Sequence, residues 1–487
     1  MGIYSFLDKT LLNKFCFRMV NLFVCSIYFM PSTMNIADIP TKICFIWGGI
    51  IAINELFVKR SVFKMKYGVL LFLVLVSFAI TSILNRDFGL IRNIYNLGYL
   101  AISCLVLFPV GEDYDLEMKN LIKLSNLFIC LILLAGFISI IQFCFIISYH
   151  VPTGIPGLLA RQGFMESRLF GVYTSPNVGA FFGFVSVVCS LFIISQEKER
   201  SKKYNVFLIT NGIIQLLYYI LSSSRGVQIT IYAFLLSFFF LMFVSKNFRN
   251  RVLTFLKLSL KKFIVGAILV LLFFSLGVDF SKSVLSYIPL VSNNSKLVSN
   301  NGNPIKKVEE NKGDDSKITI EHSEPNAEVS SGRFTIWKAA ITVWKHRPIF
   351  GYGDINFYHN SPTDNALSAL HLTDLDRKEL KRSHGNMHNG YLQVLLSSGI
   401  IGFLLIYLFY GLSFFYIFKN FLNRNDNQIL IAGLMLSFLV SVFANELVEA
   451  HILFNKRDAV SQIFWFVFGL LIIQTSKYSK IRKSESK

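Results

Sequence analysis

Apolar runs long enough to cross a lipid bilayer recur along the whole chain. A helix needs about 20 predominantly apolar residues to cross the hydrocarbon core of a membrane. The composition agrees, because 53% of the 487 residues are apolar and only 16% are charged, whereas soluble proteins carry about a quarter charged residues. The sequence therefore predicts an all-α, polytopic membrane protein.

We predict about twelve transmembrane helices, each near the length that a bilayer requires. The expected ranges are 11–30, 39–58, 67–84, 93–110, 121–148, 176–196, 205–222, 226–245, 263–279, 391–418, 428–444 and 460–476.

Lysine and arginine gather in the short loops between these ranges, which is typical of cytoplasmic loops. With alternate crossings, both termini are expected in the cytoplasm, and four segments are expected outside. The basic segments are 58–66, 197–204, 246–263, 419–428 and 477–487, and the outward ones are 150–175, 222–226, 280–390 and 445–461.

The net charge of +19 is spread over these loops. No single basic patch results, so we do not expect nucleic-acid binding, whereas part of the charge suits anionic lipid head groups. The seven cysteines all lie in or beside apolar segments. They therefore predict no disulfide framework and no cysteine zinc site in the large polar loop.

The apolar blocks divide the chain into three parts. We expect nine membrane helices in 1–279, an extracytoplasmic loop in 280–390, and three further helices with a cytoplasmic tail in 391–487. Within the loop, 291–330 is polar and almost free of aromatic residues, which predicts a flexible insertion. In the other half, 331–390, the positions of Phe334, Trp337 and Trp344 fit one face of a short amphipathic helix.

Two arginines are candidate anion-binding residues. Arg225 lies in a Ser-rich turn between two apolar runs, and Arg333 begins the expected surface helix. The alternatives are a guanidinium that reaches to the membrane interface and an ordinary solvated arginine. Two guanidinium groups that converge suit a diphosphate, because each binds phosphate oxygens in a bidentate manner.

His388 is the candidate general base, since a neutral imidazole accepts a hydroxyl proton near pH 7. His384 would share its face if the segment were helical, yet no third zinc ligand follows a clear pattern, so we predict no metal site. We interpret Asp374 and Asp376 as a solvated helix face. Glu446, Glu449 and His451 either orient an acceptor, pair with Arg457, or form an interfacial polar turn.

Several motifs resemble the O-antigen ligase and O-antigen polymerase family of bacterial membrane proteins. That family's signature is similar to one segment of this chain, in which nine residues separate His388-Asn389 from Gly399-Ile-Ile-Gly402. The further similar pieces, in the same order, are Arg168-Leu-Phe-Gly-Val-Tyr-Thr-Ser-Pro-Asn-Val-Gly, Ser224-Arg225-Gly226, Arg333 four residues before Trp337, and Pro348-x-x-Gly351-x-Gly353.

The resemblance implies a metal-independent, inverting glycosyl transfer from an undecaprenyl-diphosphate-linked donor, with no cofactor. It assigns Arg225 and Arg333 to the diphosphate and His388 to deprotonation of the acceptor hydroxyl. Arg168 and Asn177 are expected at the lipid-facing mouth of the site. The remaining substrate-binding candidates, which lie beside His388, are His384, Asn389 and Tyr391.

Three functions stay open. The enlarged loop favours a polymerase that extends lipid-linked repeat units of an O-antigen, capsule or exopolysaccharide. A ligase that moves the finished glycan to a lipid A core or another surface acceptor uses the same chemistry. A transporter of lipid-linked oligosaccharide belongs to another class, although it normally places its polar groups near the bilayer midplane. The expected partners are the donor, the acceptor and membrane lipids, and a chain-length regulator is a further candidate. We expect the protein in the bacterial plasma membrane.

Overall fold

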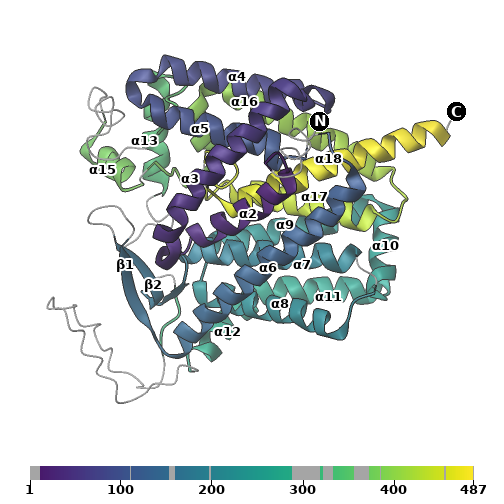
Figure 1. The fold of residues 1–487 in the computed structure, drawn as a ribbon. Helices are drawn as coiled ribbons and strands as arrows, with labels where there is room; N and C mark the ends of the chain where they lie inside the picture. The colour runs from purple at the N-terminus through teal and green to yellow at the C-terminus, as the bar shows by residue number, and fades with distance from the viewer. Residues whose placement is uncertain are drawn as a thin grey trace.

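The computed structural model describes residues 11–109, 111–152, 159–196, 199–287, 318–321, 333–355, 372–383, 385–454 and 457–485. These residues form a helical bundle with one small antiparallel sheet at its edge (Figure 1). The helices before the sheet are α2 (Lys14–Tyr28), α3 (Pro31–Ile53), α4 (Gly68–Leu84), α5 (Leu90–Ile102) and α6 (Tyr114–Cys144). The sheet contains β1 (Ser148–Pro152), β2 (Leu159–Met165) and β3 (Arg168–Gly171). The later helices are α7 (Pro176–Gln196), α8 (Lys202–Ser222), α9 (Arg225–Val244), α10 (Lys246–Leu256), α11 (Leu260–Leu272), α12 (Val278–Leu285), α13 (Arg333–His346), α15 (Asp374–Arg382), α16 (Gly390–Leu422), α17 (Ile429–Asn445) and α18 (Ala459–Glu485).

The all-α membrane architecture is confirmed, but the number of twelve spans is not. Each predicted range overlaps a helix, yet among the described residues nine helices are long and apolar enough to cross a membrane, and α4 and α17 are shorter apolar helices. The first predicted range contains α2, which has only 15 residues. This helix buries Arg18, whose guanidinium pairs with Glu112 at 3.1 Å and Glu117 at 2.7 Å.

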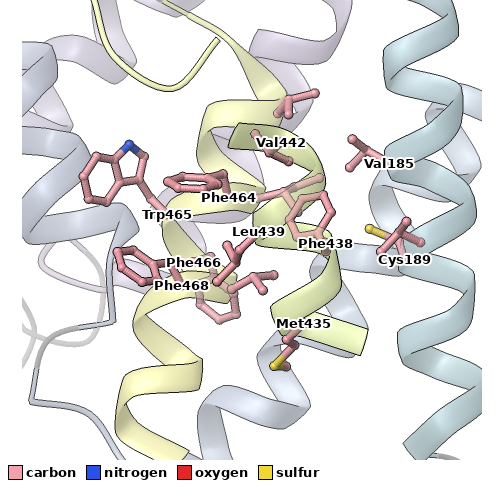
Figure 2. Packing of buried hydrophobic residues seen from close by; sticks show 14 of the residues in the cluster. Val185, Cys189, Met435, Phe438, Leu439, Val442, Phe464, Trp465, Phe466 and Phe468 are labelled. Atoms are coloured by element: carbon pink, nitrogen blue, oxygen red, sulfur yellow. The ribbon is translucent and has the colours of Figure 1, made fainter. Parts of the chain in front are cut away.

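Aromatic and aliphatic side chains from α7, α17 and α18 form the centre of the bundle (Figure 2). α17 presents Phe438 and Leu439 between Val185 of α7 and Phe464 of α18, and all four are fully buried. A buried hydrogen bond from Asn445 Nδ2 to Thr230 Oγ1, 2.7 Å long, also joins the end of α17 to the start of α9. This packing fixes the positions of the helix ends. The polar loops that follow these ends are therefore fixed as well.

A second, smaller core lies where α13 and α15 pack beside the start of α16. The predicted helix in the second half of the large loop is confirmed as α13. Its buried face is made by Ile336, Ala339, Ala340 and Val343. Trp337 and Trp344 pack against this core, whereas Phe334 is 63% exposed. Figure 1 shows α13, α15, β1 and β2 at the same end of the bundle.

The predicted flexible insertion, 291–330, lies outside the described residues except for 318–321. That short piece contacts the rest of the molecule, because the amide of Ile318 donates to the carbonyl of Ser286 and the amide of Glu321 donates to that of Ser167. Ile320 is 4% exposed.

Helix α16 is broken at Gly399, and the Pro-x-x-Gly-x-Gly segment fills the break. Gly399 has φ +62°, which favours glycine. The amide of Ile400 donates to the carbonyl of Pro348 at 2.8 Å, and the amide of Gly353 donates to that of Ser397 at 2.8 Å. The backbone groups released by the break are therefore satisfied. Both glycine motifs of the sequence thus join the small core to the bundle.

Candidate active site

His388 contacts a carboxylate that lies 61 residues further along the chain. Its Nδ1 is 2.9 Å from Oε2 of Glu449. An ionised carboxylate only accepts hydrogen bonds, so Nδ1 carries the hydrogen and the neutral ring keeps its free lone pair on Nε2. The His388 side chain is 35% exposed. It can therefore accept a proton from a molecule in the site.

Glu449 is satisfied by three donors. Its other oxygen, Oε1, accepts from Arg333 Nη2 at 2.8 Å and from Asn177 Nδ2 at 3.1 Å. Burial of the side chain would raise the pKa of Glu449, but the hydrogen bond from His388 and the charge of Arg333 outweigh it and hold this pKa at about 2. Glu449 is thus a carboxylate at neutral pH.

The loop that carries Glu449 is fixed against the start of α16. The amide of Gly390 donates to the carbonyls of Glu446, at 2.7 Å, and Glu449, at 3.1 Å. Asn389 Nδ2 donates to the carbonyl of Leu447 at 3.1 Å. A Cβ atom at Gly390 would lie 1.8 Å from Glu446 Oε2, so a larger residue would displace the Glu446 side chain. These contacts set the position of Glu449 relative to His388.

Asn177, at the start of α7, links the carboxylate to the turn between α8 and α9. Its Oδ1 accepts from Arg168 Nη2 at 3.1 Å and from Ser224 Oγ at 3.0 Å. Arg168 also donates from Nε to the carbonyl of Ser222 at 2.8 Å. Four segments that are distant in the sequence therefore meet at one end of the bundle.

Arg225 is the first residue of α9 and has an exposed side chain. It has no hydrogen bond or ion pair within the described part of the chain. The side chain lines a polar cavity of about 310 Å³, together with Gln228, Asp279, Lys282 and Glu321. Burial lowers the pKa of the nearby Arg168 guanidinium, and the positive charges of Arg225 and Arg333 lower it further. The three guanidinium groups and Lys282 carry four positive charges, against three negative charges on Glu449, Asp279 and Glu321. The region is therefore slightly positive, which suits an anion.

Arg333 is held by the small core. It begins α13, and one turn later Trp337 Nε1 donates to the carbonyl of Met387 at 3.0 Å, directly before His388. His388 itself has φ 46°, and its amide donates to Asn386 Oδ1 at 2.9 Å. A tight turn thus directs the imidazole of His388 and the guanidinium of Arg333 to the same carboxylate.

The structure brings together His388, Arg333, Arg168 and Asn177, with Arg225 directly after Ser224. Asn389 instead caps α16 by accepting from the amide of Leu392 at 3.0 Å. Tyr391 donates to the carbonyl of Phe443 at 3.0 Å and stacks on Tyr407, so its hydroxyl serves helix packing.

His388 does not lie in a helix, because α15 ends at Arg382 and α16 begins at Gly390. The condition for a helical face shared with His384 is therefore not met. His384 lies outside the described residues.

Glu449 is the residue that sequence reasoning did not assign. With Glu446 and His451, it was a candidate to orient an acceptor, to pair with Arg457 or to form an interfacial polar turn. The carboxylate partner of Arg457 is instead Asp38, at 3.2 Å. Its only sequence signal is its position in a polar loop expected on the same side as His388. In the described ranges no three His, Cys, Asp or Glu side chains gather as metal ligands.

Comparison with protein families gives one match for this chain. Residues 210–407 match the model of the O-antigen ligase family. The matched range contains Arg225, Arg333 and His388, whereas Glu449 and Asn177 lie outside it. A search of curated proteins finds no match. This match, over residues 210–407, confirms the resemblance to the O-antigen ligase and O-antigen polymerase family that the motifs indicate.

Proposed function

We propose that this membrane protein is a glycosyltransferase that moves a glycan from a lipid-linked diphosphate donor to a hydroxyl of an acceptor glycan. The observation that carries the proposal is the contact between His388 and Glu449, beside an arginine that faces an open polar cavity. A positioned base and a cationic anion site are the two requirements of a metal-independent transfer.

His388 is the general base of the proposed reaction. Its Nε2 takes the proton of the acceptor hydroxyl while that oxygen attacks the anomeric carbon of the donor. Glu449 accepts the Nδ1 hydrogen and stabilises the imidazolium that forms, as a buried carboxylate does in hydrolase triads. The bond from the anomeric carbon to the diphosphate oxygen breaks, and its electron pair leaves with the diphosphate. Attack from the opposite face inverts the anomeric configuration.

Arg225 binds the departing diphosphate in this proposal. Its guanidinium has no partner among the described residues and lines the cavity of about 310 Å³. Phosphate oxygens also gain from the free amide groups at the start of a helix such as α9. Arg333 has a different role in the proposal, because its Nη2 already donates a hydrogen bond to Glu449. We infer that Arg333 orients the carboxylate and adds positive charge near the donor.

We assign the physiological reaction to polymerisation of lipid-linked repeat units, with an undecaprenyl carrier and a site on the outer face of the plasma membrane. The length of the loop between the membrane segments, 280–390, supports this choice over a ligase. The basic loops 58–66, 246–263 and 419–428 support the sidedness.

The proposal is tested with purified protein and one lipid-linked repeat unit as the only substrate, with products separated by length. The expected result is a ladder of longer lipid-linked glycans that is absent with His388→Ala. If wild-type protein leaves the substrate unchanged but transfers it once a lipid A core acceptor is added, the polymerase assignment is wrong and the ligase is correct. A ladder of normal length with His388→Ala would refute the general base.

A further inference from the structure

A large apolar cavity lies at the end of the bundle opposite to the site. Its volume is about 490 Å³, and side chains of α7, α9, α10, α11 and the start of α17 line it. Volumes of about 300–1,000 Å³ are typical of small-molecule sites. The lining is aliphatic and aromatic apart from Ser195, so the cavity suits a hydrocarbon chain.

The cavity exists because α11 stands away from the bundle. None of the side chains of α11 is buried, and Val265, Ile268 and Leu269 are each more than half exposed. Phe263 and Val270 face the cavity across from Phe234 and Phe238 of α9. Side chains along an unfilled gap lose their dispersion contacts on that side, so a chain molecule in the gap would stabilise this arrangement.

Positive charge surrounds one end of this cavity. Lys257 lies between the lining residues Leu256 and Leu258, and Lys261 and Lys262 precede the lining residue Phe263. All three lysines are exposed, and within the described ranges their ammonium groups have no hydrogen bond or ion pair. The sequence contains no Asp or Glu from 200 to 278. Within α9, α10 and α11, three of the five elements that line the cavity, no carboxylate therefore offsets these lysines, and their ammonium groups are available to an anionic head group.

This cavity is separate from the proposed donor site. Arg225 begins α9, and Phe239 is 14 residues further along the same helix. At about 1.5 Å per residue, the two positions are roughly 20 Å apart along the helix axis. Figure 1 shows α10 at the right-hand end of the bundle and the strands at the left-hand end. A lipid held here lies in the opposite leaflet from a donor held at Arg225.

We propose that this cavity is a binding site for an anionic diacyl phospholipid, which places a hydrocarbon chain between α9 and α11 and its phosphate on Lys257, Lys261 and Lys262. The bilayer supplies the ligand, and the cationic rim selects anionic from zwitterionic lipids. The bound lipid joins α10 and α11 to the bundle.

Two matched glycine variants test the cavity. Gly266 lines it, and a Cβ atom at Gly266 would meet no atom within 4 Å, so Gly266→Leu introduces an apolar side chain at the cavity wall with open space at its Cβ. Gly212 of α8 has the same open surroundings but does not line the cavity, which makes Gly212→Leu the control. Delipidated full-length protein is titrated with dioleoyl-phosphatidylglycerol, and bound lipid is counted by native mass spectrometry. We expect Gly266→Leu to lose binding and Gly212→Leu to keep it.

Two matched lysine pairs test the head group. Each lysine near an anionic lipid contributes about fivefold to its affinity. Lys261→Gln with Lys262→Gln should therefore weaken phosphatidylglycerol roughly 25-fold and leave phosphatidylcholine unchanged. Lys202→Gln with Lys203→Gln, at the start of α8, is the control, because these lysines are equally exposed and do not line the cavity.

Three results would overturn the proposal. In the first, wild-type protein binds phosphatidylglycerol and phosphatidylcholine with equal affinity. In the second, both glycine variants bind phosphatidylglycerol alike. In the third, undecaprenyl phosphate displaces phosphatidylglycerol at equal concentration, which would identify a prenyl-phosphate site.

Discussion

The substitution Glu449→Gln tests the proposed role of the carboxylate most directly. Oε1 of Glu449 accepts from Arg333 and Asn177, so the oxygen of a glutamine stays on that side. The amide nitrogen then faces His388 Nδ1 and donates to it. The proton of the neutral ring must then lie on Nε2. In the proposed reaction, Nε2 is the atom that takes the proton from the hydroxyl of the acceptor glycan. The variant should therefore keep the wild-type fold, but His388 should no longer act as a general base.

The expected loss is on the order of 10³-fold in kcat. General-base catalysis contributes about 10²–10⁴-fold, and the equivalent carboxylate-to-amide change in a serine protease costs about 10⁴-fold. The KM for the lipid-linked donor should change less, because Arg225 and its cavity are untouched. A loss confined to kcat is the sign of an interaction made only in the transition state.

The assay is the rate of repeat-unit addition at pH 7.5, with membrane insertion and unfolding temperature checked in parallel. Glu446→Gln is the control, because it makes the same change three residues away. Burial raises the pKa of Glu446 to about 7, so glutamine resembles its protonated form. Its Oε1 accepts from the amides of His451 and Ile452, which glutamine preserves. Equal rates for wild type and Glu449→Gln, or equal losses in both variants, would refute the reasoning.

Three further predictions follow from the same contacts. Arg225→Lys should raise the KM of the donor at least about tenfold, because an ammonium does not reproduce a bidentate guanidinium; an unchanged KM in steady-state assays would remove Arg225 from the donor site. Gly399→Ala should lower the unfolding temperature in detergent and the yield of folded protein. The reason is that an alanine Cβ would lie 2.3 Å from the carbonyl oxygen of Ile349, at a residue whose φ is +62°. Gly411→Ala, in open space on the same helix, is the control and should change neither quantity. The pKa of Glu449 is about 2 in the fold and about 4.5 when unfolded, so the stabilisation from its ionised form is lost as the pH falls from 4.5 toward 2. The difference in unfolding temperature between wild type and Glu449→Gln should therefore narrow between pH 4.5 and pH 3, and an unchanged difference over that range would contradict the assignment.

Hydropathy locates the helices of this chain because the bilayer imposes a length and an apolar composition on each span. The small sheet could not be predicted in this way. β3 has four residues and β2 seven, and β2 includes Arg161, Gln162 and Gly163, so no alternation of apolar and polar residues marks them. The count of twelve spans is not confirmed, because α2, α4 and α17 are each shorter than 18 residues. Within α2, Arg18 lies in an apolar stretch and pairs with Glu112 and Glu117 from elsewhere in the chain. Pairing of this kind is invisible in a single sequence.

In the candidate site, too, some residues could be predicted from the sequence and others depend on contacts between distant parts of the chain. Arg225, Arg333 and His388 stand out because their types suit anion binding and proton transfer and because they lie in polar segments expected on one side. Glu449 offers no local motif, and only the fold brings it within 2.9 Å of His388. Asn389 and Tyr391 were expected to bind substrate because they flank His388. The structure uses their side chains for a helix cap and a helix contact.

The groups that we propose for catalysis lie on two packed units, and the contacts between these units determine what can displace the groups. His388 and Arg333 belong to the small core around α13, whereas Arg225 and Asn177 begin helices of the main bundle. Two of the contacts that connect the units are called joints here: the backbone bonds across the break at Gly399, and Glu449, which receives hydrogen bonds from both sides. Loss of either joint lets the base move relative to the cavity that we assign to the diphosphate. Because a misplacement of about 1 Å can cost about 10²-fold in rate, defects at the joints should reduce turnover before they reduce donor binding.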